Sequence, residues 1–461
     1  MLNEGTRVVG DAWERSYGDL AWLPMQAERV LPWYFLCSSG RSVQGAGVKT
    51  GPAAMAFWQV DSEGVSLWLD VRNGGDGVLL GQRTLLLATV VQQQGQPGEN
   101  AWQTASALCR AMVSGTEVVR RRGGYSLDAV YGSNDWYYAY GKNSPDGILR
   151  DADLMRELAP AAPYKPFCII DDGYQDPVRF PSMARLAEDI RKRGVAPGIW
   201  IRPTRASKSD NPNLLLPQAH WANRASTDLV YDPTIPEARA LVLASVKEAC
   251  DWGYDFIKHD FTTYELLGQW GFQMGASPTR PGWSFHDGTR TNAEIIQTLY
   301  ADIRATAGAD RIILGCNTVG HLSVGHFDAS RTGDDVSGRD WERTRHMGVN
   351  TLAFRLPQNR IFFATDADCV PITPDVPWAH TEAWLRAVAE SGSVLLVSPD
   401  PASMGPEQKR AVRAAFQRSA SKPAFEPVDW VETNAPTRWR SRTGEQKFRW
   451  LDASGASPFS S

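Results

Sequence analysis

The sequence predicts a (β/α)8 TIM barrel that lies between an N-terminal β-sandwich-like domain and a small C-terminal β element. Three observations support this prediction. Short apolar strands alternate with amphipathic helical stretches in the middle of the chain, alternating strand-like runs precede them, and 461 residues are too many for one core. We therefore expect residues 1–125 to form the N-terminal domain, residues 126–405 the barrel, and residues 406–461 a C-terminal helix with a short β region.

The first region contains strand-like runs in which apolar and polar residues alternate. The runs are "MAFWQVD", "VSLWLDVRN" and "RTLLLATVVQQQ", and Gly, Asn and Gln separate them. This alternation is typical of antiparallel sheets that bury one face. A helix-like stretch, "AWQTASALCRAMV" at residues 101–113, closes the region.

Eight strand-like segments follow, with helical stretches between them. The strand-like segments are 128–136, 166–175, 195–203, 254–261, 311–317, 326–336, 360–369 and 393–400. The helical stretches are 182–194, 236–253, 291–308, 340–355 and 381–392, and each has Gly or a basic residue near its end, as helix termini often do. A doubly wound sheet would alternate in the same way. However, it should carry a GxGxxG turn after its first strand, and "YGSNDWYYAYG" is not one.

Composition and charge restrict the classes of function. Hydrophobic residues make up 43% and charged residues 22% of the chain, which is the balance of a soluble globular protein. The formal charge of −4 gives no electrostatic reason to bind nucleic acid or an anionic membrane. None of the six cysteines forms a CxxC pair, which argues against zinc and redox motifs. The chain starts without an apolar signal core, so we expect a cytoplasmic protein, or a periplasmic or secreted one if a leader has been removed.

Polar side chains occur where the predicted barrel strands end. They are Asp171, Asp172, Arg202, Lys258, Asp260, Asn317, Arg331, Asp334, Asp335, Asp366 and Asp368. A single Asp after a strand is usually a helix cap or a turn former, but this explanation is hard to apply to five strands at once. Active sites of such barrels lie at the C-terminal ends of the strands. The sequence therefore predicts a functional cup at that end.

Two carboxylates on different strands that face one pocket are the minimum for glycoside hydrolysis. One attacks the anomeric carbon, and the other protonates the leaving oxygen and later activates water. The same carboxylates could bind a hard cation. However, Lys258 and Arg331 would place positive charges beside the ion, so we expect neither a metal nor another cofactor. A metal-dependent lyase or aldolase is the alternative that chelation would reveal.

Six segments resemble, in order, motifs of the melibiase-type α-galactosidases. The segments are "YGSNDWYYAYG", "IIDDGYQ", "GIWIRP", "IKHDF", "RTGDDV" and "ATDADC". These enzymes belong to glycoside hydrolase clan D, which includes the α-N-acetylgalactosaminidases and the raffinose synthases. The resemblance runs from about residue 127 to residue 400, strand after strand. Any one motif is weak evidence, whereas the ordered set is specific.

The resemblance implies catalytic and substrate-binding roles. Asp260 corresponds to the catalytic nucleophile and Asp335 to the general acid/base, with Asp334 as the rival for the second role. The implied reaction is retaining and exo-acting, through a covalent glycosyl-enzyme, on an oligosaccharide or glycoside. The implied sugar contacts are Trp136 as an aromatic wall, Lys258, Arg331 near the 2-hydroxyl, and Asp171 with Asp172 at the 4- and 6-hydroxyls. Trp200, Asp366 and Asp368 are further candidates at strand ends.

Three positions depart from the family pattern. His259 stands between lysine and nucleophile where the family has an aromatic residue, and Tyr174 follows the Asp pair where it has tryptophan. The fifth strand ends "LGCNTVGH" rather than in a Cys-x-Trp or Gly-rich motif, so Asn317 would read the 2-position of the sugar.

Several functions therefore remain open. The glycone is galactose or a close relative such as β-L-arabinopyranose. A transglycosylase similar to raffinose synthase, and a sugar-binding protein without turnover, are alternatives. A homo-oligomer is compatible with the sequence.

Overall fold

Eight parallel strands form the centre of the computed structural model, which describes residues 5–40, 42–113, 121–160 and 164–451. The strands are β11 (Tyr131–Asn134), β12 (Phe167–Ile170), β13 (Ala196–Ile201), β16 (Phe256–His259), β17 (Ile312–Gly315), β18 (Ala329–Arg331), β19 (Ala364–Asp366) and β21 (Leu395–Pro399). Each pairs in parallel with the next, and β21 pairs with β11. A bridge between Asp366 and Val394 closes the ring between β19 and β21. The predicted barrel is confirmed.

The seventh strand of the barrel is kinked. It continues after β19 as β20 (Val370–Ile372), which also pairs with β21. Between the two parts, Asp368 has a φ of 72°, a conformation that residues other than glycine seldom adopt. A strained backbone conformation of this kind persists only where the surrounding structure stabilises it, and such conformations are common at functional sites.

Alternation along the strands decides which side chains face the barrel interior. Phe167, Ile169, Phe256 and Ile312 belong to a cluster of buried side chains within the ring of strands. Since side chains alternate along a strand, Lys258 lies on the same side as Phe256. A strand that begins with an apolar inward residue can therefore end with a charged one at the mouth of the barrel.

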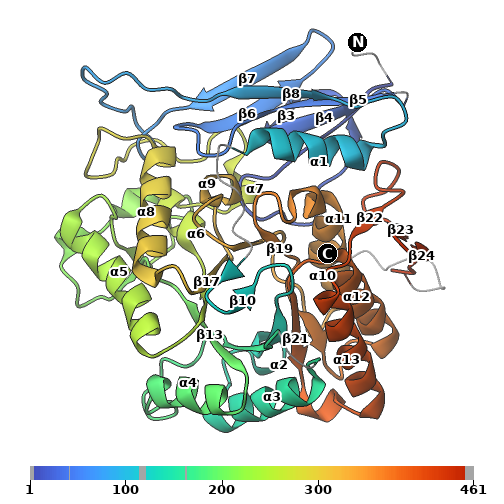
Figure 1. Cartoon of the computed structure of the whole chain (residues 1–461). Coiled ribbons are helices and arrows are strands. Elements are labelled where there is room, and N and C mark those ends of the chain that lie inside the picture. The colour runs from blue at the N-terminus through green and yellow to red at the C-terminus, as the bar shows by residue number, and fades with distance from the viewer. Residues whose placement is uncertain (1–4, 41, 114–120, 161–163, 452–461) are drawn as a thin grey trace.

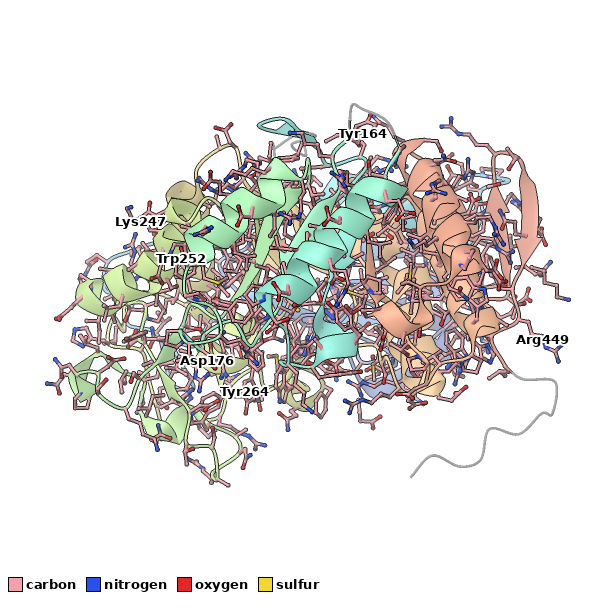
Figure 2. The ribbon with its side chains drawn as sticks, turned by 90° about the horizontal axis from the view of Figure 1, so that it is seen from below. Tyr164, Asp176, Lys247, Trp252, Tyr264 and Arg449 are labelled. Atoms are coloured by element: carbon pink, nitrogen blue, oxygen red, sulfur yellow. The ribbon has the colours of Figure 1, made fainter. Side chains whose placement is uncertain are left out.

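Helices surround the strands (Figure 1). They include α3 (Pro145–Leu158), α4 (Met183–Lys192), α5 (Pro236–Asp251), α8 (Asn292–Ala307), the succession α10 (Trp341–Thr344), η3 (Arg345–Asn350) and α11 (Thr351–Arg355), and α12 (Trp378–Ser391). The helix α13 (Pro406–Ala420) packs against α3 and α12, which is the place of an eighth barrel helix. Seen from below, α3 lies between α4 and α13, with Lys247 of α5 and Arg449 toward opposite edges (Figure 2).

The 14-residue helix α3 was missing from the sequence-based prediction. Its first turn is capped by Ser144, whose hydroxyl accepts a hydrogen bond from the N–H of Gly147 at 3.2 Å, and Pro145 occupies the first turn. Ile148, Ala152 and Met155 form its buried face. These cap and spacing signals were present in the sequence.

Two antiparallel sheets form the N-terminal part, as predicted. One sheet contains β1 (Arg7–Gly10), β2 (Leu23–Pro24), β4 (Tyr34–Ser38), β5 (Val43–Val48) and β8 (Val90–Gln94). The other contains β3 (Gln26–Pro32), β6 (Met55–Val60) and β7 (Val65–Asp70), and α1 (Ala101–Met112) packs on β5 and β8. Figure 1 shows these sheets as a layer along one side of the barrel.

The C-terminal β element is a three-stranded antiparallel sheet of β22 (Phe425–Pro427), β23 (Arg438–Ser441) and β24 (Gly444–Lys447). Stacked aromatic rings form its core: Phe425 lies 5.2 Å from Trp439, and Phe448 lies 4.8 Å from Trp450, between ring centroids. The division of the chain at residues 125 and 405 stays a proposal.

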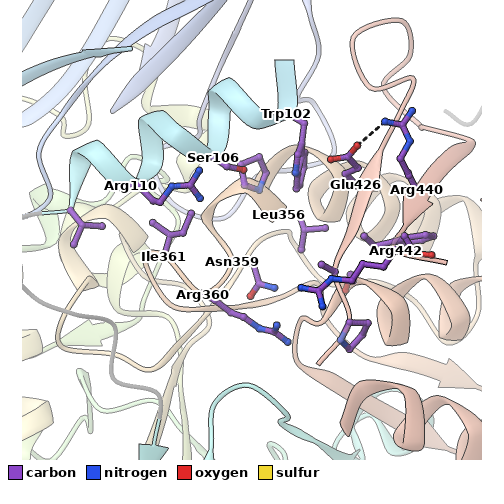
Figure 3. A pocket seen from close by; sticks show the side chains of 17 residues that line it. Trp102, Ser106, Arg110, Leu356, Asn359, Arg360, Ile361, Glu426, Arg440 and Arg442 are labelled. Atoms are coloured by element: carbon purple, nitrogen blue, oxygen red, sulfur yellow. Dashed lines mark hydrogen bonds and ion pairs between the residues drawn. The ribbon is translucent and has the colours of Figure 1, made fainter. Parts of the chain in front are cut away.

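A cavity of about 1210 Å³ lies between α1, the turn η4 (Leu356–Gln358) and the C-terminal sheet (Figure 3). Its described lining includes Arg110, Arg360 and Arg442, and an ion pair between Arg440 and Glu426 at 3.1 Å. None of the predicted site residues is among the described residues that line it. Within the described ranges, no helix combines the length and the hydropathy that a membrane crossing requires.

Candidate active site

Asp260 follows β16 directly and is buried at the mouth of the barrel. Its Oδ2 accepts a hydrogen bond from Nε1 of Trp200 at 3.0 Å, and its Oδ1 accepts one from the N–H of Phe261 at 2.7 Å. Burial acts to raise the pKa of Asp260, but the charges of Arg15 and Lys258 and these two hydrogen bonds outweigh it. The pKa therefore lies below its usual value, and Asp260 is ionised at neutral pH.

Lys258 and Asp171 form a buried ion pair beside Asp260. Nζ of Lys258 lies 2.7 Å from Oδ2 of Asp171, and Nδ2 of Asn134 donates to the same oxygen at 2.7 Å. Burial opposes the charge on Lys258, but Asp171 outweighs it and the pKa of Lys258 lies above its ordinary value. The neighbouring Asp172 is only half-buried, and its Oδ1 accepts hydrogen bonds from within its own loop.

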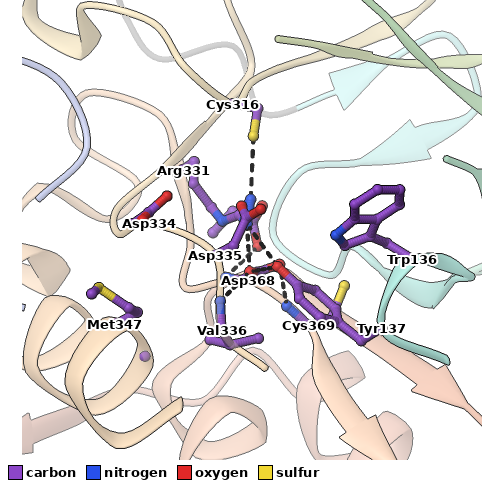
Figure 4. Close-up of polar contacts among 12 residues, drawn as sticks. Trp136, Tyr137, Cys316, Arg331, Asp334, Asp335, Val336, Met347, Asp368 and Cys369 are labelled. Atoms are coloured by element: carbon purple, nitrogen blue, oxygen red, sulfur yellow. Dashed lines mark hydrogen bonds and ion pairs between the residues drawn. The ribbon is translucent and has the colours of Figure 1, made fainter. Parts of the chain in front are cut away.

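Arg331 connects the sixth and seventh strands (Figure 4). Its Nη2 lies 3.0 Å from Oδ1 of Asp335, forms an ion pair with Asp368, and donates to the hydroxyl of Tyr137 at 3.3 Å. Its Nη1 donates to Sγ of Cys316 at 3.2 Å. The guanidinium is buried, whereas the side chain of Asp335 is 42% exposed, so Asp335 is the member of this cluster that a ligand can reach.

The kinked seventh strand supplies two carboxylates behind Arg331. The positive φ of Asp368 lets its Oδ2 accept the N–H of Val336 at 2.9 Å, directly after Asp335. Oδ1 of Asp366 accepts the N–H of Asp368 at 3.0 Å, and burial raises the pKa of Asp366 to about 6. Asp366 and Asp368 therefore support the chain around Arg331 and Asp335.

Asp334 and Asp335 have different surroundings. Oδ1 of Asp334 lies 2.8 Å from Nη2 of Arg15, and its Oδ2 lies 2.8 Å from Nη2 of Arg343. Its side chain is 17% exposed, and Figure 4 shows it apart from the cluster around Asp335. Ion pairs at both oxygens leave Asp334 less free to exchange a proton, which favours Asp335 as the acid/base candidate.

Three predicted site residues do not face the mouth in the expected way. Both ends of the Asn317 amide are occupied, because Nδ2 donates to Glu14 and Oδ1 accepts the N–H of Tyr264 at 2.9 Å. His259 lies on the opposite face of β16 from Lys258, and burial lowers its pKa to about 4. The ring of Tyr174 lies edge-on to Trp252, at 6.3 Å between centroids. We therefore leave these residues out of the proposed sugar contacts.

Trp136 opens the short helix α2 (Trp136–Ala139) and is partly exposed. Its ring lies 5.7 Å from that of Tyr140, and Figure 4 shows it beside the mouth, next to Tyr137. Its position is compatible with the predicted aromatic wall. Within the described residues, no three His, Cys, Asp or Glu side chains are grouped so that they could hold a metal ion.

Sequence reasoning missed Arg15, Tyr137 and Cys316. Tyr137 directly follows Trp136 and Cys316 directly precedes Asn317, both of them predicted site residues, so they could have been found. Arg15 comes from the N-terminal part of the chain, where only its place in the mixed charged and aromatic segment "AWERSYG" gave a signal.

No family model matches the chain. Its structure is similar to that of an α-galactosidase from Thermus thermophilus in complex with p-nitrophenyl α-D-galactopyranoside, with a TM-score of 0.67 and 18% identity over 96% of this chain and 91% of that one. It is also similar to a GH36 α-galactosidase variant from Geobacillus stearothermophilus in complex with 1-deoxygalactonojirimycin (TM-score 0.62, 12% identity, 95% and 65% covered). An α-galactosidase from Lactobacillus brevis gives a TM-score of 0.63 at 14% identity, with 95% and 63% covered. At these identities the likeness shows the fold alone.

Proposed function

We propose that this protein is a retaining, exo-acting α-glycosidase that releases terminal α-linked galactose from an oligosaccharide or glycoside. The observation that carries the proposal is the presence of an ionised, buried Asp260 after the fourth barrel strand and an accessible Asp335 after the sixth, at the same mouth of the barrel. The α-galactosidases with the same fold support the choice of sugar, since one was solved with p-nitrophenyl α-D-galactopyranoside and another with 1-deoxygalactonojirimycin.

The proposed reaction has two steps. In the first, Asp260 attacks the anomeric carbon, the bond to the leaving oxygen breaks, and Asp335 gives its proton to that oxygen. In the second, Asp335 takes a proton from water, the water oxygen attacks the anomeric carbon, and the bond to Asp260 breaks. Two inversions give net retention, and the enzyme returns to its starting protonation state.

The polar groups around the two carboxylates suit a sugar substrate. Nζ of Lys258 can donate, and Asp171 and Asp172 can accept, charge-assisted hydrogen bonds from sugar hydroxyls. The low pKa of Asp260 favours attack by the carboxylate at neutral pH, where a protonated carboxyl would not react. A protein that only binds sugar would have no need of both an ionised Asp260 and an accessible Asp335 at one barrel mouth.

Hydrolysis of a panel of nitrophenyl α- and β-glycosides, including β-L-arabinopyranoside, tests the proposal. Asp260→Ala should abolish release, and azide should restore it with formation of the β-galactosyl azide, because azide replaces the missing nucleophile in a single inversion. Asp335→Ala with azide should instead give the α-galactosyl azide, by attack on the covalent intermediate. Asp334→Ala is the matched control and should give no azide product. Identical azide products from Asp260→Ala and Asp335→Ala would contradict the assigned roles.

A further inference from the structure

The segment that follows β1 reaches from the N-terminal domain to the barrel mouth. Ser16 pairs with Gly333 in a parallel bridge. Its N–H donates to the carbonyl of Thr332 at 2.9 Å, and its carbonyl accepts the N–H of Asp334 at 2.8 Å. The segment therefore lies directly beside the loop that carries Asp335, the proposed acid/base.

Several buried contacts fix this segment in place. The carbonyl of Glu14 accepts Nη1 of Arg355 at 2.7 Å, and its carboxylate accepts the N–H of Gly271 at 2.8 Å and bonds to Asn317. Nε1 of Trp13 donates to the carbonyl of Gly275 at 2.8 Å. These contacts leave the segment little freedom to move. Because Arg15 lies between Glu14 and Ser16, the position of its side chain is fixed relative to the barrel.

Arg15 extends from this segment into the site. Its side chain is only 7% exposed, and its guanidinium lies 5.5 Å from the ring centroid of Trp270. Nη2 pairs with Asp334, while Nη1 lies 3.5 Å from Oδ1 of Asp335 and 3.8 Å from Sγ of Cys316. The oxygen that Nη1 approaches is the same one that Arg331 binds at 3.0 Å.

We propose that Arg15 is a positioning residue for the acid/base step, an inference that rests on the proposed glycosidase function. Together with Arg331 it fixes Oδ1 of Asp335, which leaves Oδ2 to carry the proton. When Asp335 is neutral, Oδ1 accepts hydrogen bonds from the guanidinium groups and the proton sits on Oδ2. After Oδ2 gives this proton to the leaving oxygen, the two guanidinium groups stabilise the carboxylate, which then takes a proton from water through Oδ2.

Arg15 also acts on the nucleophile. Among the groups that lower the pKa of Asp260, Arg15 has the largest influence, ahead of Lys258. A neutral residue at this position should therefore raise the pKa of Asp260 and move the acidic limb of the kcat/KM profile to higher pH. A group that only stabilised the fold would not move this limb.

The experiment compares Arg15→Met with Arg15→Lys and with Arg343→Met. Arg343 pairs with Asp334 at the same 2.8 Å as Arg15 does, and within the described residues it forms no ion pair with Asp335, so it is a matched control. Each variant is assayed with a dinitrophenyl galactoside, whose leaving group needs no proton, and with methyl galactoside, whose leaving group does.

Arg15→Met should lower kcat/KM by about 10- to 100-fold on the methyl galactoside and far less on the dinitrophenyl galactoside. The reason is that kcat/KM reports the first step, in which a misplaced acid affects only departure of a leaving group that needs a proton. Arg15→Lys should recover part of this loss, and Arg343→Met should leave the ratio of the two rates unchanged. Equal losses on both substrates in Arg15→Met, which would leave the ratio of the two rates unchanged, would overturn the inference.

A crystal structure of Arg15→Met separates failure of this inference from failure of the proposed function. If the wild type releases no sugar from any galactoside, the function is wrong, but the carboxyl of Asp335 should still turn in Arg15→Met and keep its place in Arg343→Met. An unchanged Asp335 in both variants would refute the positioning role, whatever the reaction.

Discussion

His259 provides a test of how burial governs charge beside the proposed nucleophile. Its ring lies 5.3 Å from that of Phe327 and 6.2 Å from that of Tyr300, between ring centroids. Nε2 forms a hydrogen bond with the hydroxyl of Thr262, and Nδ1 has no hydrogen-bond partner among the described residues. This apolar setting favours the neutral imidazole. We predict that His259→Phe makes the protein less sensitive to acid and leaves the pH profile of catalysis intact.

The size of the effect follows from the pKa of His259. Burial lowers it from 6.5 to about 4, so between these values the unfolded chain binds a proton that the folded chain does not. The stability that depends on the neutral ring is therefore complete above about pH 6.5 and is lost as the pH falls toward 4. One pH unit corresponds to about 1.4 kcal/mol, so the loss amounts to about 3 kcal/mol.

Urea unfolding of wild type and His259→Phe at about pH 7.5, 6 and 5 measures this difference. Loss of the bond to Thr262 should cost the variant about 1 kcal/mol at every pH. Its unfolding free energy should then fall less steeply with acid than that of the wild type. Replacement of the exposed His286 by Gln is the control. Equal pH slopes for wild type and His259→Phe would refute the reasoning, and loss of a limb of the kcat profile in the variant would indicate that His259 carries a proton during the reaction.

Three further predictions follow from the contacts of the site. Trp200→Phe removes the hydrogen bond to Asp260 and should lower kcat about tenfold, as glycoside kinetics would show; an unchanged kcat would contradict it. Asn317→Ala removes the hydrogen bonds to Glu14 and to the N–H of Tyr264 and should cost about 1–3 kcal/mol of unfolding free energy in urea, with no change in preference between galactoside and arabinopyranoside; a changed preference would count against it. Lys258→Met leaves the buried carboxylate of Asp171 without its cation and should cost about 3–5 kcal/mol of unfolding free energy in the same assay. A loss below about 1 kcal/mol would argue against a buried pair.

Local patterns in the sequence were sufficient to predict the barrel. Each strand is an apolar run that ends at charged or polar residues. Because parallel strands share one orientation, these polar ends all lie at the same mouth of the barrel. The same alternation also carried information about His259. It stands between Lys258 and Asp260, and a period of two residues places it on the other face of β16. The departure from the family motif at this position is therefore a matter of packing against Tyr300 and Phe327.

Contacts between distant segments could not be predicted in this way. Arg15 meets Asp334 and Asp335 because the segment after β1 pairs with the loop after β18, across more than 300 positions of sequence. No period or spacing within either segment indicates that pairing. The contact of Asn317 was not foreseen for the same reason, since its partner Glu14 belongs to the same N-terminal segment. The barrel mouth is thus completed by residues from outside the barrel.

The ion pairs of the site provide an independent argument for the nucleophile. Of the buried carboxylates at the strand ends, Asp171 pairs with Lys258 and Asp368 pairs with Arg331, so their lone pairs are bound to cations. Asp260 and Asp366 have no ion pair in the described structure and accept hydrogen bonds from neutral donors. Burial raises the pKa of Asp366 to about 6, whereas nearby charges hold that of Asp260 below its usual value. Asp260 therefore stays ionised at acidic pH values at which Asp366 takes up a proton, and it has no ion pair in the described structure, which is the state that attack on an anomeric carbon requires.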